Sequence, residues 1–309
     1  MKNLDRLTDN HIISALAIDQ RGALKRMLGD VSETDISRFK VLISKYLTPY
    51  ASSILLDPEY GQDAAGDRDS ECGLLMAYEK TGYDKTEPGR LPDLLDEWSV
   101  RELKDKGTEA IKLLVYIDPD EEREINIQKE SFIQRVGSEC RGEDIPFFLE
   151  IITYDKDIED AKSREFAEKK PGKILKVIEE YGKEKYGVDV FKVEVPVNMN
   201  YVEGYCEDPV YTKIEALAHF KEQSDASGVP FIFLSAGVTS EMFNETLRFA
   251  KEAGSQFNGV LCGRATWAGA ADAYHEGGFE AVEEWMKTTG TKNIQTLREV
   301  VQECASPIK

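Results

Sequence analysis

The stretch VFKVEVPV (Val190–Val197) decides the fold class of this chain, because it alternates apolar and charged residues with the two-residue period of a β-strand. Phe191 and Val193 fall on one face of that strand, and Lys192 and Glu194 fall on the other. A charge inside a buried strand is costly unless it is paired or solvated. We therefore expect the apolar face to pack under helices and Lys192 to point into a polar interior.

Seven other short apolar runs resemble this stretch and are separated from one another by longer polar segments. They are SALAID (14–19), SSILLDP (52–58), LLMAYEKTGY (74–83), AIKLLVYID (110–118), PFFLEIITY (146–154), PFIFLSAGV (230–238) and GVLCGRAT (259–266). Several of the segments between them show helical periodicity, with Thr239 or Ser240 as an N-cap and Gly254 as a stop signal in one case. The polar segments between the runs are long enough for the crossover connections that parallel strands need.

Eight such units predict an α/β fold, a single (β/α)₈ TIM barrel spanning residues 1–309, with N-terminal and C-terminal helical extensions. An open doubly wound sheet is the structural rival. The first run is followed by neither GxGxxG nor a P-loop, which removes the usual reason for choosing that fold. The segment 61–73 has weak helix signals, so we expect the second crossover to be an ordered loop.

Composition narrows the class of protein. The chain has 309 residues, and 41% of them are hydrophobic, which argues against intrinsic disorder. Its formal net charge of −19 argues against binding to nucleic acids or to anionic membranes. Five dispersed cysteines without a CxxC pair indicate free thiols in a reducing compartment. We expect a cytoplasmic protein, since neither a signal peptide nor a long apolar run is evident in the sequence.

Seven of the eight runs carry ionisable residues in or near their carboxyl-terminal halves. These are Asp19, Asp57, Glu79, Lys80, Lys112, Glu150, Lys192, Glu194 and Arg264. The carboxyl ends of barrel strands converge on one mouth, where active sites of this fold lie. A structural ion-pair network is the alternative interpretation, and it is the more common one for any single residue of this kind.

Two lysines on nearby strands, with carboxylates between them, suit Schiff-base catalysis. A neutral lysine amine attacks a ketone and loses water to form an iminium, which stabilises the electrons of a breaking C–C bond. A nearby cation favours the neutral amine, and a carboxylate removes the hydroxyl proton. The sequence offers few ligands for a catalytic metal ion. The three histidines, His11, His219 and His275, lie away from the strand ends and show no HExxH spacing. We expect neither a metal nor another cofactor.

The last two runs indicate a phosphate site. SAGV (235–238) and CGRATWAG (262–269) each place a small residue and a glycine at a strand end, before an expected helix start. Barrel enzymes often hold phosphate there with backbone N–H groups, and Arg264 adds a charged fork. Gly237 closing a turn is the alternative interpretation.

The sequence resembles the tagatose 1,6-bisphosphate aldolase family, class I aldolases of the bacterial lactose and galactose tagatose-6-phosphate pathway. Seven stretches carry the resemblance: IISALAIDQRGALKRML (12–28), TPYASSILLDPEYG (48–61), AYEKTGYD (77–84), RLPDLLDEWSV (90–100), GSECRGEDIPFFLEIITYD (137–155), DVFKVEVPVNMNYVEGY (189–205) and NGVLCGRATWAGA (258–270). The resemblance implies a metal-independent aldehyde-lyase on a (β/α)₈ barrel.

The resemblance also implies residue roles. Lys192 corresponds to the Schiff-base lysine, Glu150 to the acid/base carboxylate, Lys112 to the second lysine and Asp19 to the aspartate near the reacting carbons. Positions matching the phosphate and substrate contacts are Ser235, Gly237, Gly263 and Arg264 for the C1 phosphate, Lys80 for the far phosphate, and Gln20 and Arg21 beside Asp19.

The implied partner is a phosphorylated ketose, D-tagatose 1,6-bisphosphate, cleaved to dihydroxyacetone phosphate and D-glyceraldehyde 3-phosphate. Loose discrimination between epimers, including fructose 1,6-bisphosphate, is implied as well. Alternatives are an aldolase for a sulfonated ketose phosphate and a bisphosphate-binding regulatory protein. Oligomeric state stays open, a homo-oligomer being one option.

Overall fold

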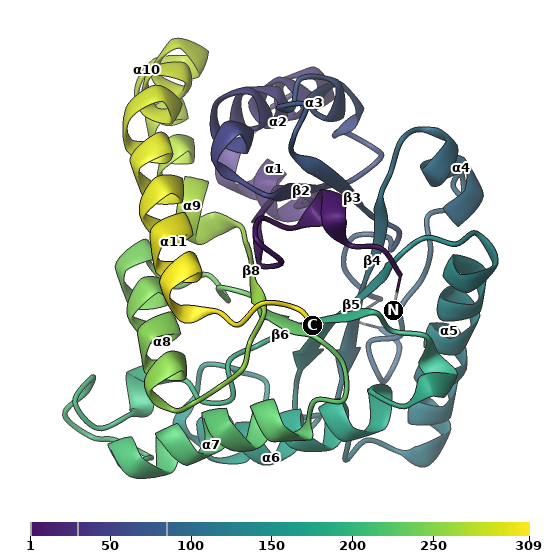
Figure 1. Cartoon of the computed structure of the whole chain (residues 1–309), viewed down its shortest axis with the longest axis vertical. Helices are drawn as coiled ribbons and strands as arrows, with labels where there is room; N and C mark the ends of the chain where they lie inside the picture. Colours follow the sequence, from purple (N-terminus) through teal and green to yellow (C-terminus); the bar gives the residue numbers. More distant parts are fainter. Residues whose placement is uncertain (1, 30, 85) are drawn as a thin grey trace.

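A computed structural model describes residues 2–29, 31–84 and 86–309 of the chain, and it contains a closed barrel of eight parallel strands (Figure 1). The strands pair in sequence order, and β8 closes the barrel against β1. They are β1 (Ile13–Ala17), β2 (Ser53–Leu56), β3 (Gly73–Ala77), β4 (Ala110–Ile117), β5 (Phe147–Thr153), β6 (Val190–Val193), β7 (Phe231–Phe233) and β8 (Gly259–Cys262). The predicted barrel is confirmed, and the doubly wound rival is wrong.

Helices fill the crossovers and form the outer layer of the molecule (Figure 1). They are α1 (Gly22–Leu28), α2 (Glu33–Leu47), α3 (Gln62–Gly66), α4 (Val100–Asp105), α5 (Arg123–Gly142), α6 (Arg164–Tyr181), α7 (Lys213–Ala226), α8 (Ser240–Glu252), α9 (Arg264–Trp267), α10 (Gly269–Trp285) and α11 (Thr291–Cys304). The β2–β3 crossover, expected as a loop, contains the five-residue α3. Thr239 caps α8 by accepting the Met242 N–H, as predicted.

All eight strands are shorter than the apolar runs that predicted them. The run 74–83 continues for six residues beyond the end of β3, and the run 190–197 continues for four beyond β6. In the first case the chain turns into a narrow excursion, in which Lys80 N–H donates to the Asp93 carbonyl. The residues beyond the strand therefore form the wall of the barrel mouth and do not extend the sheet.

Strand register places the charged side chains of β5 and β6 at one level. Glu150 of β5 lies opposite Leu114 of β4 on one side and Lys192 of β6 on the other. Because alternate residues of a strand face the same way, Lys112 shares the inner face with Leu114 and Tyr116. This is the parity expected from the sequence.

The core has two layers. Alternate strand residues such as Leu75, Phe148, Val190 and Ile232 fill the barrel interior, whereas their neighbours such as Phe191 pack under the helices. Leu4 and Leu7, from the N-terminal segment that contains the 3₁₀ turn η1 (Asp5–Leu7), join the interior group.

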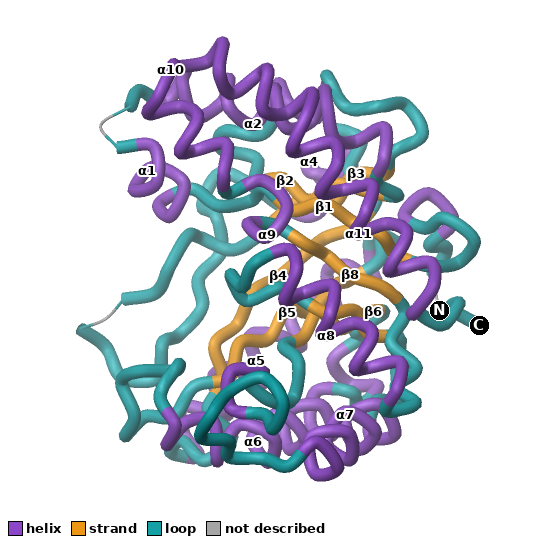
Figure 2. The backbone as a smooth tube through the Cα atoms, turned by 90° about the vertical axis from the view of Figure 1, so that its left-hand side faces the viewer, coloured by secondary structure: helices purple, strands orange, loops and turns teal. Residues whose placement is uncertain are grey.

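The two ends of the barrel differ. Both chain termini lie at one end, and the longest connecting loops lie at the other (Figure 2). Near the end of the chain, the π-helical turn η5 (Met286–Gly290) joins α10 to α11. Within the described ranges, no helix is both long and apolar enough to cross a membrane.

Candidate active site

The four residues predicted to do chemistry form one continuous chain of ion pairs at the carboxyl ends of the strands. Lys192 Nζ lies 2.7 Å from Glu150 Oε1, and the other carboxylate oxygen of Glu150 lies 3.1 Å from Lys112 Nζ. Lys112 Nζ in turn lies 2.7 Å from Asp19 Oδ2. Strands β4, β5 and β6 carry three of these residues side by side, and Asp19 follows β1.

Glu79 is a fifth member of this chain. Its Oε1 lies 2.5 Å from Lys112 Nζ, and its Oε2 accepts the Leu114 N–H at 3.1 Å. The sequence marked Glu79 as a strand-end charge but not as a site residue. Its place in the carboxyl-terminal half of the run 74–83, immediately before Lys80, was the signal that could have found it.

Lys112 is fully buried, with three carboxylates around it. Burial alone would lower the pKa of Lys112, but Asp19, Glu79 and Glu150 outweigh it and raise the pKa well above the ordinary lysine value. Burial likewise opposes the charged form of Asp19, yet the ammonium groups of Lys112 and Lys192 hold its pKa below the usual range. Lys112 is therefore a fixed positive charge at the centre of the group.

A cavity of about 380 Å³ opens directly above these ion pairs. Of the eleven site residues predicted from the sequence, ten line it: Asp19, Gln20, Arg21, Lys80, Glu150, Lys192, Ser235, Gly237, Gly263 and Arg264. Lys112 lies beneath its floor. Arg26, Tyr116 and Ile152 also line the cavity and were not predicted as site residues.

One carboxylate oxygen and one amide oxygen, both from residues that line this cavity, lack a hydrogen-bond partner among the described residues. Asp19 Oδ1 and Gln20 Oε1 are buried and accept no hydrogen bond from the described residues. Buried acceptors are normally satisfied. Asp19 and Gln20 therefore each hold an unsatisfied acceptor next to the cavity that these residues line.

The loops after β7 and β8 form one wall of the cavity. Ala236 and Gly237 have positive φ angles of 49° and 77°, a left-handed turn that favours glycine. The guanidinium of Arg264 lies against this turn, since a Cβ at Gly237 would come within 3.1 Å of Arg264 Nη2. Backbone N–H groups, the α8 N-terminus and an exposed arginine together suit an anion.

The other predicted binding residues are already paired within the chain. Arg21 is buried and donates at 2.5 Å to Glu59 Oε2 and at 2.8 Å to the Glu79 carbonyl. Lys80 lies at the rim, where its Nζ is 2.7 Å from Asp93 and 2.9 Å from Asp96. Arg21 thus links the residues Glu59 and Glu79 next to the cavity. Lys80 is half-exposed, so it is free to exchange its carboxylate partners for the anion of a ligand.

Some strand-end charges serve the structure alone. Asp57 forms a fully buried ion pair with Lys40 of α2, and Glu194 pairs at 3.2 Å with Lys170 of α6. The expectation that all seven charged strand ends meet at the mouth is wrong for these two residues. Their partners are helix lysines that the sequence pattern did not reveal.

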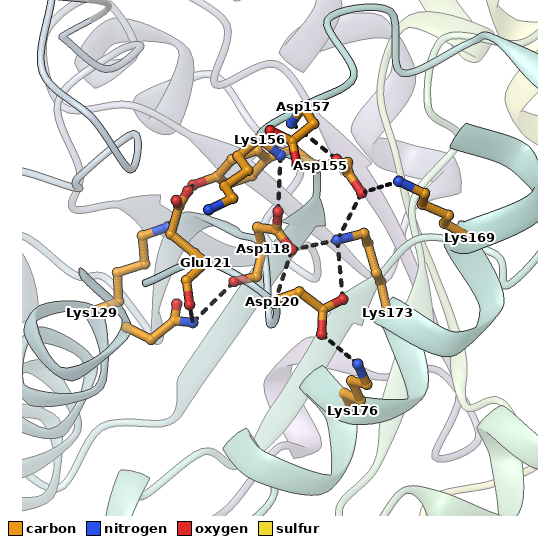
Figure 3. A network of polar contacts seen from close by, with 12 residues as sticks. Asp118, Asp120, Glu121, Lys129, Asp155, Lys156, Asp157, Lys169, Lys173 and Lys176 are labelled. Carbon is orange, nitrogen blue, oxygen red and sulfur yellow. Dashed lines mark hydrogen bonds and ion pairs between the residues drawn. The ribbon is translucent and has the colours of Figure 1, made fainter. Parts of the chain in front are cut away.

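A second charged cluster also lies outside the cavity. Figure 3 shows Lys173 between Asp118, Asp120 and Asp155, with Lys169 and Lys176 at its edges. Lys173 is 3% exposed and is buried together with Asp118 and Asp155, whereas Asp120 lies at the surface. This arrangement fits a structural network joining β4 and β5 to α6. Over the described ranges 2–29, 31–84 and 86–309, no group of three or more His, Cys, Asp or Glu side chains is arranged to hold a metal ion.

Comparison with known proteins gives the family. A family model described as "DeoC/LacD family aldolase" matches residues 13–269, from the first barrel strand to the start of α10. The chain belongs to the DeoC/LacD family of aldolases. The resemblance inferred from the sequence motifs is confirmed.

Curated relatives of this aldolase are similar over nearly their whole length. "Tagatose 1,6-diphosphate aldolase 2" of Enterococcus faecalis (strain ATCC 700802 / V583) is 60% identical over 309 residues, covering 98% of this chain and 93% of the relative. "Tagatose 1,6-diphosphate aldolase" of Staphylococcus aureus (strain JH9) is 55% identical over 314 residues, covering 99% and 96%.

Solved structures with a similar fold are also aldolases by name. A fructose-bisphosphate aldolase from Plasmodium falciparum aligns with a TM-score of 0.72 at 13% identity, covering 98% of this chain and 93% of the other. An archaeal fructose 1,6-bisphosphate aldolase aligns with a TM-score of 0.62 at 14% identity, covering 97% and 98%. At these identities the likeness supports the TIM-barrel fold of this aldolase.

Proposed function

We propose that this aldolase is a metal-independent class I enzyme that cleaves D-tagatose 1,6-bisphosphate to dihydroxyacetone phosphate and D-glyceraldehyde 3-phosphate, and that it also accepts fructose 1,6-bisphosphate. The observation that carries the proposal is the contact of 2.7 Å between Lys192 Nζ and Glu150 at the floor of the cavity. The names of the relatives from Enterococcus faecalis and Staphylococcus aureus support the substrate.

In the proposed mechanism, Lys192 loses a proton and its neutral amine attacks the ketone carbon of the open-chain sugar. Glu150 lies close enough to take the proton of the amine and to return one to the departing hydroxyl, so that water leaves and an iminium forms. Lys112, 3.1 Å from the second oxygen of Glu150, keeps a positive charge beside that carboxylate throughout.

The iminium then accepts the electron pair of the C3–C4 bond. A carboxylate removes the C4 hydroxyl proton as that bond breaks, which leaves an enamine on Lys192 and releases the aldehyde. Asp19 and Gln20 line the cavity beside Lys192 and Glu150, where the sugar hydroxyls would lie. Protonation of the enamine at C3 and hydrolysis of the iminium release dihydroxyacetone phosphate and restore the lysine.

Two anion sites are needed for a bisphosphate. The turn at Ser235–Gly237 with Gly263 and Arg264 suits the phosphate nearest the ketone, because it adjoins β6 and β8 around Lys192. Lys80, at the rim of the cavity after β3, suits the remote phosphate. Neither site distinguishes the C4 epimers by charge, which is consistent with acceptance of both bisphosphates.

The test is reductive trapping. Purified protein is incubated with dihydroxyacetone phosphate and sodium borohydride, digested and analysed by mass spectrometry. We expect a triose-phosphate adduct on Lys192 in the wild type and no adduct in Lys192→Arg, which keeps a cation beside Glu150 but forms no stable imine. An adduct on the Lys192→Arg variant, or none on the folded wild type, would contradict the mechanism.

A chelator separates this class from a metal-dependent aldolase. We expect cleavage of tagatose 1,6-bisphosphate to continue unchanged after dialysis against EDTA. Loss of cleavage that Zn²⁺ restores would show that the reaction needs a metal. Parallel assays with fructose 1,6-bisphosphate then measure the epimer preference directly.

A further inference from the structure

One wall of the candidate active site comes from the long connection between β3 and α4. In its described stretches, 78–84 and 86–95, the Lys80 N–H donates to the Asp93 carbonyl at 2.9 Å and the Leu95 N–H donates to the Tyr78 carbonyl at 3.1 Å. Lys80, Thr81 and Gly82 line the cavity beyond this paired stem. Whatever holds the connection in place therefore also shapes the cavity.

Arg90 connects this segment to the barrel. Its guanidinium carbon lies 4.1 Å from the ring centre of Tyr154, 5.1 Å from that of Tyr83 and 5.9 Å from that of Tyr116. We call these three tyrosines and Arg90 the tyrosine cage. Guanidinium groups stack favourably on aromatic faces, and the attraction strengthens when the pair is shielded from water.

The cage joins the connection to the cavity directly. Tyr83 belongs to the connection, and its ring packs edge-on against Tyr116 of β4, with 4.9 Å between the ring centres. Tyr116 itself lines the cavity beside Glu150. Arg90 and Tyr83 thus both contact Tyr116, a side chain of the cavity wall.

The far side of the cage is rigid. Tyr154 is 3% exposed, its hydroxyl donates to Glu121 at 2.7 Å, and the buried Lys129 donates to that hydroxyl at 3.1 Å. Figure 3 shows Glu121 and Lys129 within the polar network at the ends of β4 and β5. Arg90 therefore binds to an aromatic ring that cannot move freely.

Two consecutive residues with positive φ angles, Gly89 and Arg90, place the Arg90 side chain in the cage. Gly89 has a φ angle of +88°, and a Cβ there would come within 2.4 Å of Ile125 Cγ2 on α5. Arg90 itself has a φ angle of +50°, which is uncommon for a residue with a side chain. Such a conformation persists only where surrounding contacts compensate for it, and here the cage supplies them.

We infer that Arg90 is a positioning residue for substrate affinity: through the tyrosine cage it holds Lys80, Thr81 and Gly82 in place as the wall that meets the phosphate remote from the ketone. The inference rests on the proposed function, because it assumes a bisphosphate bound with its ketone at Lys192. Arg90 acts through its neighbours, since it does not line the main cavity itself.

The test compares a bisphosphate with a substrate that lacks the remote phosphate. For Arg90→Ala we expect the KM for fructose 1,6-bisphosphate to rise about tenfold or more, while kcat/KM for fructose 1-phosphate changes less than about twofold. Arg90→Lys, which keeps the charge but loses the planar group, should fall between wild type and Arg90→Ala. Arg101→Ala, an exposed arginine on α4, is the matched control and should behave as wild type.

Equal losses for both substrates, or unchanged KM values, would overturn the inference. Tyr83→Ala opens the cage from its other side and should reproduce the effect of Arg90→Ala, which provides a second test should Arg90→Ala fold poorly. Borohydride trapping of dihydroxyacetone phosphate by Arg90→Ala should stay intact. If the wild type itself is not trapped, the proposed function fails; if trapping is normal but the substrate ratio is unchanged, only the role of Arg90 fails.

Discussion

At the scale of single residues, Lys112 is the most informative side chain of the molecule. A fully buried ammonium among three buried carboxylates is a poor choice for stability alone, since apolar residues of similar volume often serve as well. Its position fits a role in which a fixed positive charge is needed beside Glu150 and Asp19. The mechanism proposed above requires that charge, because both carboxylates must be ionised in order to accept a proton.

Replacement of Lys112 should therefore harm both stability and activity. In Lys112→Met three buried carboxylates lose their common cation, so we expect about 3–5 kcal/mol less stability at pH 7. Cleavage should fall about 100- to 10,000-fold, as for loss of acid–base assistance. Urea unfolding and steady-state assays measure the two effects. Lys104→Met, at an exposed position of α4, is the control; a Lys112→Met enzyme as stable as this control would contradict the argument.

The charge state of Asp19 predicts how stability depends on pH. Since the folded protein holds the pKa of Asp19 below its ordinary value of 3.8, this ion pair contributes fully above that value and is lost as the pH falls through the lowered one. Stability of the wild type should thus decline below about pH 4. Asp19→Asn should be less stable at pH 7 and show a shallower acid decline in urea titrations. Parallel profiles for the two proteins would exclude this contribution.

At the scale of single elements, the strand ends determine which side chains meet. The sequence allowed the prediction of Lys192, Glu150 and Lys112 as neighbours, because alternation along β4, β5 and β6 fixes which way each residue faces. It did not allow the prediction of Arg90, because the cage depends on a loop conformation with positive φ and on two tyrosines of the barrel, Tyr116 in β4 and Tyr154 directly after β5. Such long-range loop contacts leave no periodic pattern.

The turn between β7 and α8 predicts a separable effect on phosphate binding. Gly237→Ala places a Cβ 3.1 Å from Arg264 Nη2 at a φ angle of +77°, so both the turn and the guanidinium must shift. We expect a stability loss of about 1–2 kcal/mol from the left-handed backbone, and a KM for bisphosphate raised about tenfold with a smaller change in kcat.

Inhibition by inorganic phosphate is the direct measurement for this turn, since it should weaken in parallel with the KM. Gly66→Ala is the matched control, because a Cβ there meets nothing within 4 Å and its φ angle is ordinary. Unchanged phosphate inhibition in Gly237→Ala would place the anion elsewhere in the cavity.

At the scale of the whole molecule, the barrel separates stability from chemistry. The charged cavity lies at the carboxyl ends of the strands, while Leu4 and Leu7 cover the apolar interior from the N-terminal segment. The sequence predicted eight strands and a charged mouth, but it did not separate Asp57 and Glu194 from the cavity. That distinction depends on where Lys40 of α2 and Lys170 of α6 reach the barrel, which only the packed helices determine.

This separation predicts a variant that loses stability and keeps its activity. Leu7 is 1% exposed in the interior group, and its carbonyl accepts hydrogen bonds from the hydroxyls of Ser52 and Ser53. Leu7→Ala should cost about 2–5 kcal/mol of unfolding free energy, whereas Ile127→Ala, at a 45%-exposed position, should stay within about 0.5 kcal/mol of wild type.

The kinetic half of this prediction is the stricter one. Because Leu7 and the cavity lie at opposite ends of a closed barrel, kcat/KM per folded Leu7→Ala molecule should equal that of wild type at 25 °C. The folded fraction is taken from circular dichroism in the same buffer. A fall in kcat/KM beyond the folded fraction would mean that the interior transmits strain from the N-terminal segment to the floor of the cavity, since a close-packed core cannot absorb a new void at one end without shifting residues further along.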